Sequence, residues 1–237
     1  MTIESPFHEF IQVAGVRDRR EAELLVTCGV RYLGFPLRLP VNAEDLTEAE
    51  AAELIRSFRP PVHGVLITYL DRAMEIAGFM AELGASVVQL HGDISPAELR
   101  NLRQARPDIR VIKSLVVGER NHEDLKDQVR LLGDLVDAFI TDTFDPATGA
   151  SGATGKTHEW GVSRELRTLS QKPLILAGGL HPGNVREAIA FVGPAGVDAH
   201  TGVEDAEGRK DPAKVRAFVA AAREGFRRMR QQKLPIV

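Results

Sequence analysis

Short apolar runs alternate with amphipathic segments along the chain. The runs are rich in Val, Ile and Leu and lack strict alternation with polar residues, which is typical of parallel strands covered on both faces. We expect strands over Phe10–Ala14, Tyr32–Pro36, Val62–Thr68, Ser86–Leu90, Arg110–Val117, Ala138–Thr141, Pro173–Ala177 and Gly196–His200.

The segments between these runs carry apolar residues at helical spacing. Thr47, followed by Glu50 three residues later, predicts a capping box at one helix start. Gly29, Gly84 and Gly133 stand where a helix needs a left-handed C-terminal residue. We expect helices over Asp18–Thr27, Thr47–Ser57, Asp71–Leu83, Ser95–Ala105, Glu123–Leu132, Ser163–Leu169, Asn184–Phe191 and Asp211–Arg228.

The regular rhythm makes about eight strand–helix units of roughly 30 residues each. The sequence therefore predicts an α/β fold, a (β/α)8 TIM barrel with a closed parallel sheet, as a single domain over residues 1–237. The alternative is an open doubly wound sheet, which also alternates strands and helices. The first strand-to-helix turn, Ala14–Arg17, decides little, because it lacks the glycine pattern of a dinucleotide site.

Charge and composition narrow the classes of function. A net charge of −3 gives no electrostatic case for a nucleic-acid partner or an anionic membrane. No segment reaches the ~18 consecutive apolar residues of a membrane span, and the N-terminus lacks the pattern of a signal peptide. The lone Cys28 cannot form an internal disulfide, so we expect a reducing compartment, the cytoplasm. The oligomeric state stays open.

Functional residues of a barrel lie at the C-terminal ends of strands and in the loops that follow. The longest irregular segment is Asp142–Thr157, and its Gly, Ala, Ser and Thr content suits a mobile loop near a ligand. It ends in Gly155–Thr157, which matches part of a P-loop. Ala150 stands where that motif requires glycine, so an ATP site is not favoured.

Two neighbouring loops have the character of a phosphate site. Gly178 and Gly179 end one predicted strand shortly before a helix, and His200, Thr201 and Gly202 end the next. Glycine amides beside a helix N-terminus can bind an anion, and barrels commonly bind phosphate after their seventh and eighth strands. These glycines could instead only permit tight turns. We expect a small phosphorylated molecule as the ligand.

Six segments, in this order, resemble the phosphoribosylanthranilate isomerase family. They are VQLHG (Val88–Gly92), VIK (Val111–Lys113), TDT (Thr141–Thr143), GATGKTHEW (Gly152–Trp160), LAGGLHPGNV (Leu176–Val185) and GVDAHTGVEDAEGRKD (Gly196–Asp211). The resemblance implies a (β/α)8 barrel and an Amadori rearrangement of a phosphoribosyl amine, with no metal and no organic cofactor. A general acid opens the sugar ring, and Asp142 matches that acid. A cysteine base then removes the C2 proton.

The chain departs from the family pattern at three places. Ala14 occupies the position of the cysteine base, and Cys28 lies too late in the first helix to replace it. In Gly34–Thr47 no arginine aligns cleanly with the one that binds the anthranilate carboxylate, although Arg38 lies nearby. His200 replaces a small hydroxyl residue near the phosphate. We therefore expect poor or no turnover of phosphoribosylanthranilate.

Several candidate residues keep more than one interpretation. His200 could bind phosphate or substrate, act as a relocated base, or be structural. His91 is a substrate contact or a structural histidine, and Lys113 contacts substrate or forms ion pairs. No ligand spacing supports a metal at His91, His181 and His200. Asp142 could be a catalytic acid or a structural cap for the loop that follows it. As an acid, Asp142 favours an isomerase, whereas Ala14 favours a ligand-binding barrel without catalysis.

Overall fold

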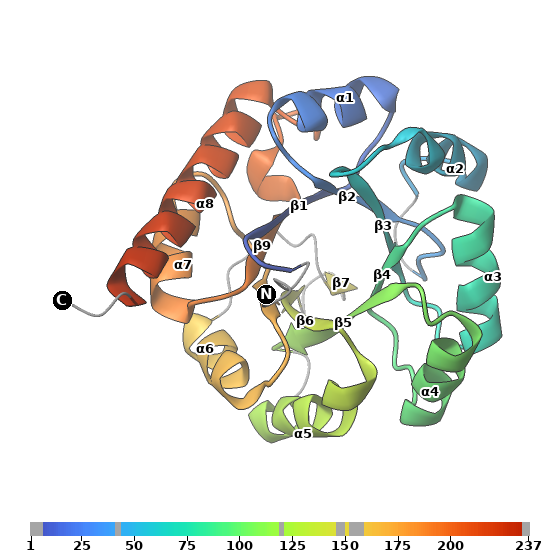
Figure 1. Cartoon of the computed structure of the whole chain (residues 1–237). Helices are drawn as coiled ribbons and strands as arrows, with labels where there is room; N and C mark the ends of the chain where they lie inside the picture. The colour runs from blue at the N-terminus through green and yellow to red at the C-terminus, as the bar shows by residue number, and fades with distance from the viewer. Residues whose placement is uncertain (1–6, 41–43, 119–120, 146–149, 152–158, 234–237) are drawn as a thin grey trace.

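The strands form a closed ring in the computed structural model, which describes residues 7–40, 44–118, 121–145, 150–151 and 159–233. β1 pairs with β2 and with β9, and the pairing of β5 with β6 completes the circle (Figure 1). The predicted (β/α)8 barrel is thus confirmed, and the open sheet is wrong. The parallel strands are β1 (Phe10–Ala14), β2 (Tyr32–Pro36), β3 (His63–Thr68), β4 (Val87–Leu90), β5 (Arg110–Val117), β6 (Ala138–Asp145), β8 (Leu174–Leu176) and β9 (Gly196–Ala199).

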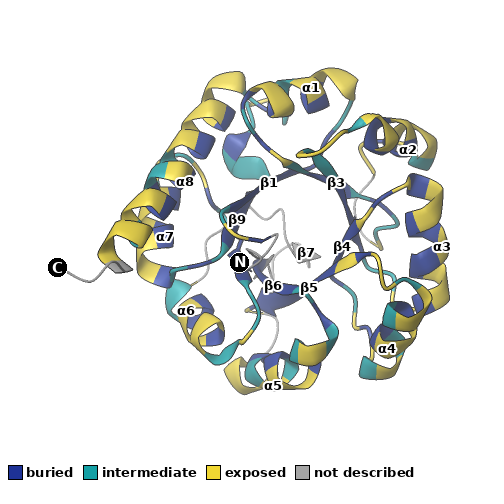
Figure 2. Ribbon diagram, in the orientation of Figure 1, coloured by how far each residue is buried: buried dark blue, intermediate teal, exposed yellow. Residues whose placement is uncertain are grey.

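Helices surround the ring, with exposed outer faces and buried faces against the strands (Figure 2). The capping box of Thr47 and Glu50 is confirmed, and Gly29 and Gly84 have the predicted positive φ. The prediction of a left-handed conformation is wrong for Gly133. Its φ is −53°, and the chain continues from α5 into a 3-10 turn. No described helix is long and apolar enough to cross a membrane. The helices are α1 (Arg19–Thr27), α2 (Glu48–Ser57), α3 (Ala73–Leu83), α4 (Pro96–Ala105), α5 (His122–Leu132), α6 (Trp160–Leu169), α7 (Val185–Val192) and α8 (Pro212–Lys233).

The segment Asp142–Thr157 is more regular at its start than the sequence predicts. β6 continues to Asp145 and pairs antiparallel with β7 (Ala150–Ser151), so a hairpin replaces the start of the expected irregular loop. The residue composition predicts an irregular loop. Composition does not reveal that the backbones of the two strands pair. Gly155–Thr157 lies outside the described residues.

Two apolar clusters make the core. The larger lies between strands and helices, and the smaller fills the inside of the barrel. Aromatic rings of Phe7, Phe10 and Tyr32 pack at the N-terminal ends of β1 and β2, with ring centroids 5.6 and 4.0 Å apart. Because these rings fill that end, polar inward-facing groups are left to the other end of the barrel.

Candidate active site

The C-terminal end of the barrel has a partly polar floor. Inward-facing side chains deep in the barrel, such as Gln12 and Ile140, are fully enclosed. By contrast, Asp142 and Asp198 each keep 7% exposure and His91 keeps 9%. These slightly exposed residues, which we call the mouth floor, mark where a ligand can reach the barrel interior.

Asp142 lies on β6, at an inward-facing position of the mouth floor. Its Oδ1 accepts a hydrogen bond from the Thr143 backbone N–H at 2.8 Å. Burial raises the pKa of Asp142 to about 7, although the Thr143 hydrogen bond works in the opposite direction. A carboxyl group with this pKa is substantially protonated at neutral pH, as a general acid requires. The strand runs three residues past Asp142, because the hairpin with β7 extends it.

Asp198 is a second buried carboxyl group, and the sequence reasoning missed it. It lies on β9 directly beside Gln12 of β1. Burial, followed by the charge of Asp142, raises the pKa of Asp198 to about 7. The available signal was one acidic residue at an inward position of the otherwise apolar strand Gly196–Ala199.

A chain of side-chain amides connects β1 to His91. Gln12 Nε2 donates to Gln89 Oε1 at 2.9 Å, and Gln89 Nε2 lies 2.7 Å from His91 Nε2. Burial, with the nearby Lys113 charge, lowers the pKa of His91 to about 3, so its imidazole is neutral. The ring lies 5.3 Å from that of Tyr69. His91 is therefore a neutral group held in place at the edge of the mouth floor.

Lys113 lies in the middle of β5 rather than at its end. Its ammonium donates to the backbone oxygens of Leu90 at 3.3 Å and Ser114 at 2.8 Å. Since β4 and β5 pair at this point, these bonds tie Lys113 to the barrel wall.

Arg38 is not brought together with the other predicted site residues. Its guanidinium lies 3.7 Å from the ring centroid of Phe79 on α3 and 2.8 Å from Glu48 on α2, with Glu75 at 3.6 Å. The φ of Arg38 is +53°, a conformation uncommon for a non-glycine residue. The side chain thus packs on the helical layer, where aromatic and acidic groups satisfy its charge.

The two predicted phosphate loops lie against each other. Gly178 and Gly179 have φ values of 93° and 61°, so both need the freedom of glycine. Asn184 Nδ2 donates to the Gly179 carbonyl at 3.0 Å and fixes the first loop at the start of α7. A Cβ atom on Gly202 would lie 2.0 Å from the Leu180 oxygen, so only glycine permits this approach.

Backbone amides are available at these loops. Within the described residues, the amides of Gly178, Gly179, Thr201 and Gly202 donate no backbone hydrogen bond. Unsatisfied amides near a helix N-terminus suit an anion. The geometry brings the predicted phosphate residues together.

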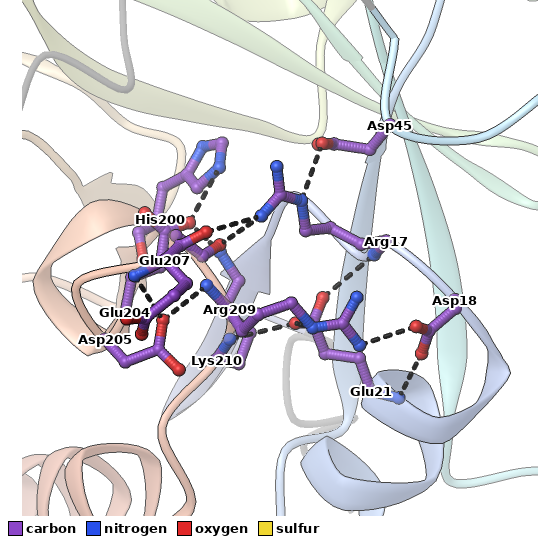
Figure 3. A network of polar contacts seen from close by, with 11 residues as sticks. Arg17, Asp18, Glu21, Asp45, His200, Glu204, Asp205, Glu207, Arg209 and Lys210 are labelled. Atoms are coloured by element: carbon purple, nitrogen blue, oxygen red, sulfur yellow. Dashed lines mark hydrogen bonds and ion pairs between the residues drawn. The ribbon is translucent and has the colours of Figure 1, made fainter.

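His200 packs over the turn after β1. A Cβ atom on Gly15 would lie 2.1 Å from His200 Nε2, so the glycine makes room for the ring. Glu204 Oε1 lies 3.4 Å from the same nitrogen and 2.6 Å from the buried Lys210 Nζ (Figure 3). Burial, with the charges of Lys210 and Arg17, lowers the pKa of His200 to about 3. A group with so low a pKa is a weak proton acceptor.

The network of Figure 3 connects the loop after β9 to the start of α1. Buried Glu21 accepts from the backbone N–H of Lys210 and from that of Arg17, both at 2.9 Å. Arg209 and Asp18 form an ion pair at 2.5 Å. These contacts hold His200 and the second phosphate loop in fixed positions.

The described residues contain no group of three His, Cys, Asp or Glu side chains placed to hold a metal ion. The floor instead offers proton donors and acceptors. This arrangement suits proton transfer on a bound phosphorylated ligand.

The family model for N-(5'-phosphoribosyl)anthranilate isomerase matches residues 11–221. The chain belongs to this isomerase family. It is 38% identical over 226 residues to N-(5'-phosphoribosyl)anthranilate isomerase 2 of Methanosarcina mazei, covering 94% of this chain and 98% of that relative.

Solved isomerase structures share the fold. The phosphoribosylanthranilate isomerase of Thermotoga maritima has a TM-score of 0.75 at 27% identity, covering 91% of this chain and 99% of the other. A second such structure, at TM-score 0.73, 25% identity and the same coverage, is a complex with reduced 1-(o-carboxyphenylamino)-1-deoxyribulose 5-phosphate. The expected resemblance is therefore confirmed.

Proposed function

We propose that this chain isomerises a phosphorylated N-ribosylamine by an Amadori rearrangement, with Asp142 as the general acid. The observation that carries the proposal is a buried carboxyl group, whose pKa is raised to about 7, on the same mouth as the phosphate loops. A protonated Asp142 can give its proton to the sugar ring oxygen at neutral pH. The family relationship supports this reaction class.

The amides of Gly178, Gly179, Thr201 and Gly202 bind the phosphate group in this proposal. His200 lies next to them and contributes a neutral hydrogen-bonding nitrogen. Its low pKa and its position near Glu204 favour this binding role over a role as base. The substrate is a small phosphorylated metabolite, which suits an enzyme of the cytoplasm.

His91 contacts the substrate from the mouth floor, as a neutral donor or acceptor. Lys113 and Arg38 have supporting roles: Lys113 bonds strand carbonyls, and Arg38 packs on α3. No arginine is thereby assigned to the anthranilate carboxylate, and Ala14 supplies no base. We therefore expect turnover well below the ~10 s⁻¹ of a median enzyme.

The test is incubation with N-(5'-phosphoribosyl)anthranilate, following loss of substrate fluorescence and formation of the ketose product. We expect slow conversion that Asp142→Asn lowers about 10²–10⁴-fold. Tight binding of the reduced product analogue with no conversion at any enzyme concentration would instead identify a ligand-binding barrel. The missing cysteine favours that second function.

A further inference from the structure

The position vacated by the family cysteine lies beside a carboxylate on the next strand. Gln12 and Ala14 point to the same side of β1, because side chains alternate along a strand. Asp198 pairs in register with Gln12. From strand spacing and rise, the Cα atoms of Asp198 and Ala14 are about 8 Å apart on the diagonal. The Asp198 side chain is therefore a diagonal neighbour of Ala14 on the inner face of the barrel.

Asp198 has unused hydrogen-bonding capacity. Its Oδ1 is buried and has no hydrogen-bond partner among the described residues, and the same holds for Gln12 Oε1. A buried acceptor without a donor costs free energy, so natural proteins keep few of them without a functional reason. Such an oxygen is well placed to accept a proton. The equal 7% exposure of Asp198 and Asp142 places both on the mouth floor.

We propose that Asp198 is the base that moves the sugar proton in this chain, in place of the missing cysteine. The proposal rests on the proposed isomerase function, because it assigns the second proton transfer of that reaction. Asp142 and Asp198 then act as a pair of carboxyl groups that share one proton between them.

Several neighbours of Asp198 favour its ionised form. Gln12 hydrogen-bonds to Asp198, and the Lys210 ammonium and the Ala199 N–H also favour the ionised form. Asp142 accepts a hydrogen bond from the Thr143 N–H, which favours its own ionised form. The proposal assigns the proton to Asp142 and the negative charge to Asp198, as an acid and a base require. His200, two residues beyond Asp198, is neutral.

The proton transfers balance within this pair. Asp142 gives its proton to the ring oxygen as the C1–O bond breaks, and the nitrogen lone pair forms a C1=N bond. Asp198 takes the C2 proton; the C–H electron pair forms C1=C2, and the C=N π pair returns to nitrogen. C1 then takes the proton back from Asp198, and the C2 hydroxyl gives its proton to Asp142. Both carboxyl groups end as they began, and no other reactant is consumed.

The experiment follows hydrogen exchange at C1 of the product ketose, 1-(o-carboxyphenylamino)-1-deoxyribulose 5-phosphate, in D2O by NMR. Exchange requires the base but not ring closure, so it reports on Asp198 separately from full turnover. We expect Asp198→Asn to slow exchange about 10²–10⁴-fold, the range for a lost general base. Binding of the reduced product analogue should stay within about threefold. Asp127→Asn, on the exposed face of α5, is the matched control and should exchange like wild type.

The outcomes separate the two proposals. If Asp198→Asn exchanges at the wild-type rate, Asp198 is not the base, and the isomerase function is untouched. If wild type exchanges but does not convert N-(5'-phosphoribosyl)anthranilate, the isomerase function fails, and the variant still decides the base. If wild type neither exchanges nor converts, both proposals fail.

A second measurement covers the case in which Asp198→Asn does not fold. Carboxyl ¹³C labelling of aspartate gives the titration of the Asp142–Asp198 pair in wild type, assigned with Asp142→Asn. The exchange rate should rise with pH together with the loss of the first proton from this pair. A rate that instead follows the ¹⁵N titration of His200 overturns the proposal.

Discussion

β6, β8 and β9 bring two buried carboxyl groups to the barrel mouth, together with four loop amides that donate no backbone hydrogen bond within the described residues. We call this the acid side. β1 and β2, adjoining it across the β1–β9 pairing, bring the methyl group of Ala14 and an arginine that packs on the helices. We call this the amine side, because the family places its cysteine and carboxylate-binding arginine there.

The two sides depend on different kinds of group. On the acid side, the proposed phosphate loops have backbone conformations that favour glycine, and burial raises the pKa of Asp142. On the amine side, each family function rests on one side chain, so a single substitution removes it. A chain that keeps the barrel fold therefore keeps the features of the acid side more readily than the single side chains of the amine side. The following predictions test that contrast.

Removal of the acid should have the largest effect. Asp142→Asn keeps the size of the side chain and its acceptor for the Thr143 N–H, but it cannot donate an acidic proton. We expect turnover to fall about 10²–10⁴-fold with unchanged binding of the reduced product analogue. Steady-state kinetics measure turnover, and calorimetry measures binding of the analogue. Undiminished turnover would remove Asp142 from the mechanism; Asp127→Asn is the control.

The pH dependence of turnover should follow the titration of Asp142. The pKa of Asp142 is raised to about 7, so the acid is present below that pH and is lost as pH rises through it. Above this value turnover should fall roughly tenfold per pH unit, as expected for one essential proton. Rates at saturating substrate from pH 5 to 9, with thermal stability at each pH as control, give the profile. A flat alkaline side would contradict the assignment.

The proposed phosphate loops should not tolerate a side chain in place of Gly202. In Gly202→Ala, the added methyl group meets the Leu180 oxygen at 2.0 Å and forces the loops apart. We expect affinity for the reduced product analogue to fall at least about tenfold, equivalent to ~1.4 kcal/mol. Gly78→Ala is the matched control, because nothing lies within 4 Å of its added Cβ. Equal affinity in both variants would count against a phosphate site here.

A substitution on the amine side should raise turnover rather than lower it. Ala14→Cys returns a thiol to the vacated position, and we expect turnover to rise by up to about tenfold. The gain is limited, because a useful thiolate needs surroundings that lower its pKa. Ala177→Cys, an inward alanine just after β8, is the control and should give no gain. No gain from Ala14→Cys would show that the missing base does not limit the reaction.

The sequence predicted the barrel and most element positions, because Val-, Ile- and Leu-rich runs and capping residues act locally. It also placed Asp142 and the glycines of the two loops at strand ends of the barrel, for the same reason. It could not show that the charge of Asp142 raises the pKa of Asp198, since that depends on β6 and β9 closing the same barrel. Nor could it show the burial of Glu21, whose carboxylate accepts a hydrogen bond from the backbone N–H of the distant Lys210. Long-range pairing, not local pattern, decides such residues.

The smallest effect on catalysis should come from Arg38. Its guanidinium is held by Phe79, Glu48 and Glu75, so Arg38→Ala should change KM for N-(5'-phosphoribosyl)anthranilate by less than about threefold. The loss should appear in stability, because a cation–π contact at a partly exposed site contributes about 0.5–1 kcal/mol. That corresponds to a fall in Tm of roughly 1–4 °C for a chain of this size.

Arg19→Ala provides the matched comparison for Arg38→Ala, because Arg19 pairs with Glu53 at 2.6 Å, is half exposed, and stacks on no aromatic ring of the described residues. We expect its Tm to stay at the wild-type value, since exposed ion pairs contribute little. If Arg38→Ala instead raises KM tenfold at constant kcat and leaves Tm unchanged, the arginine leaves Phe79 to bind the substrate carboxylate. The amine side would then have its carboxylate-binding arginine and lack only the base. The two sides would differ only through Ala14.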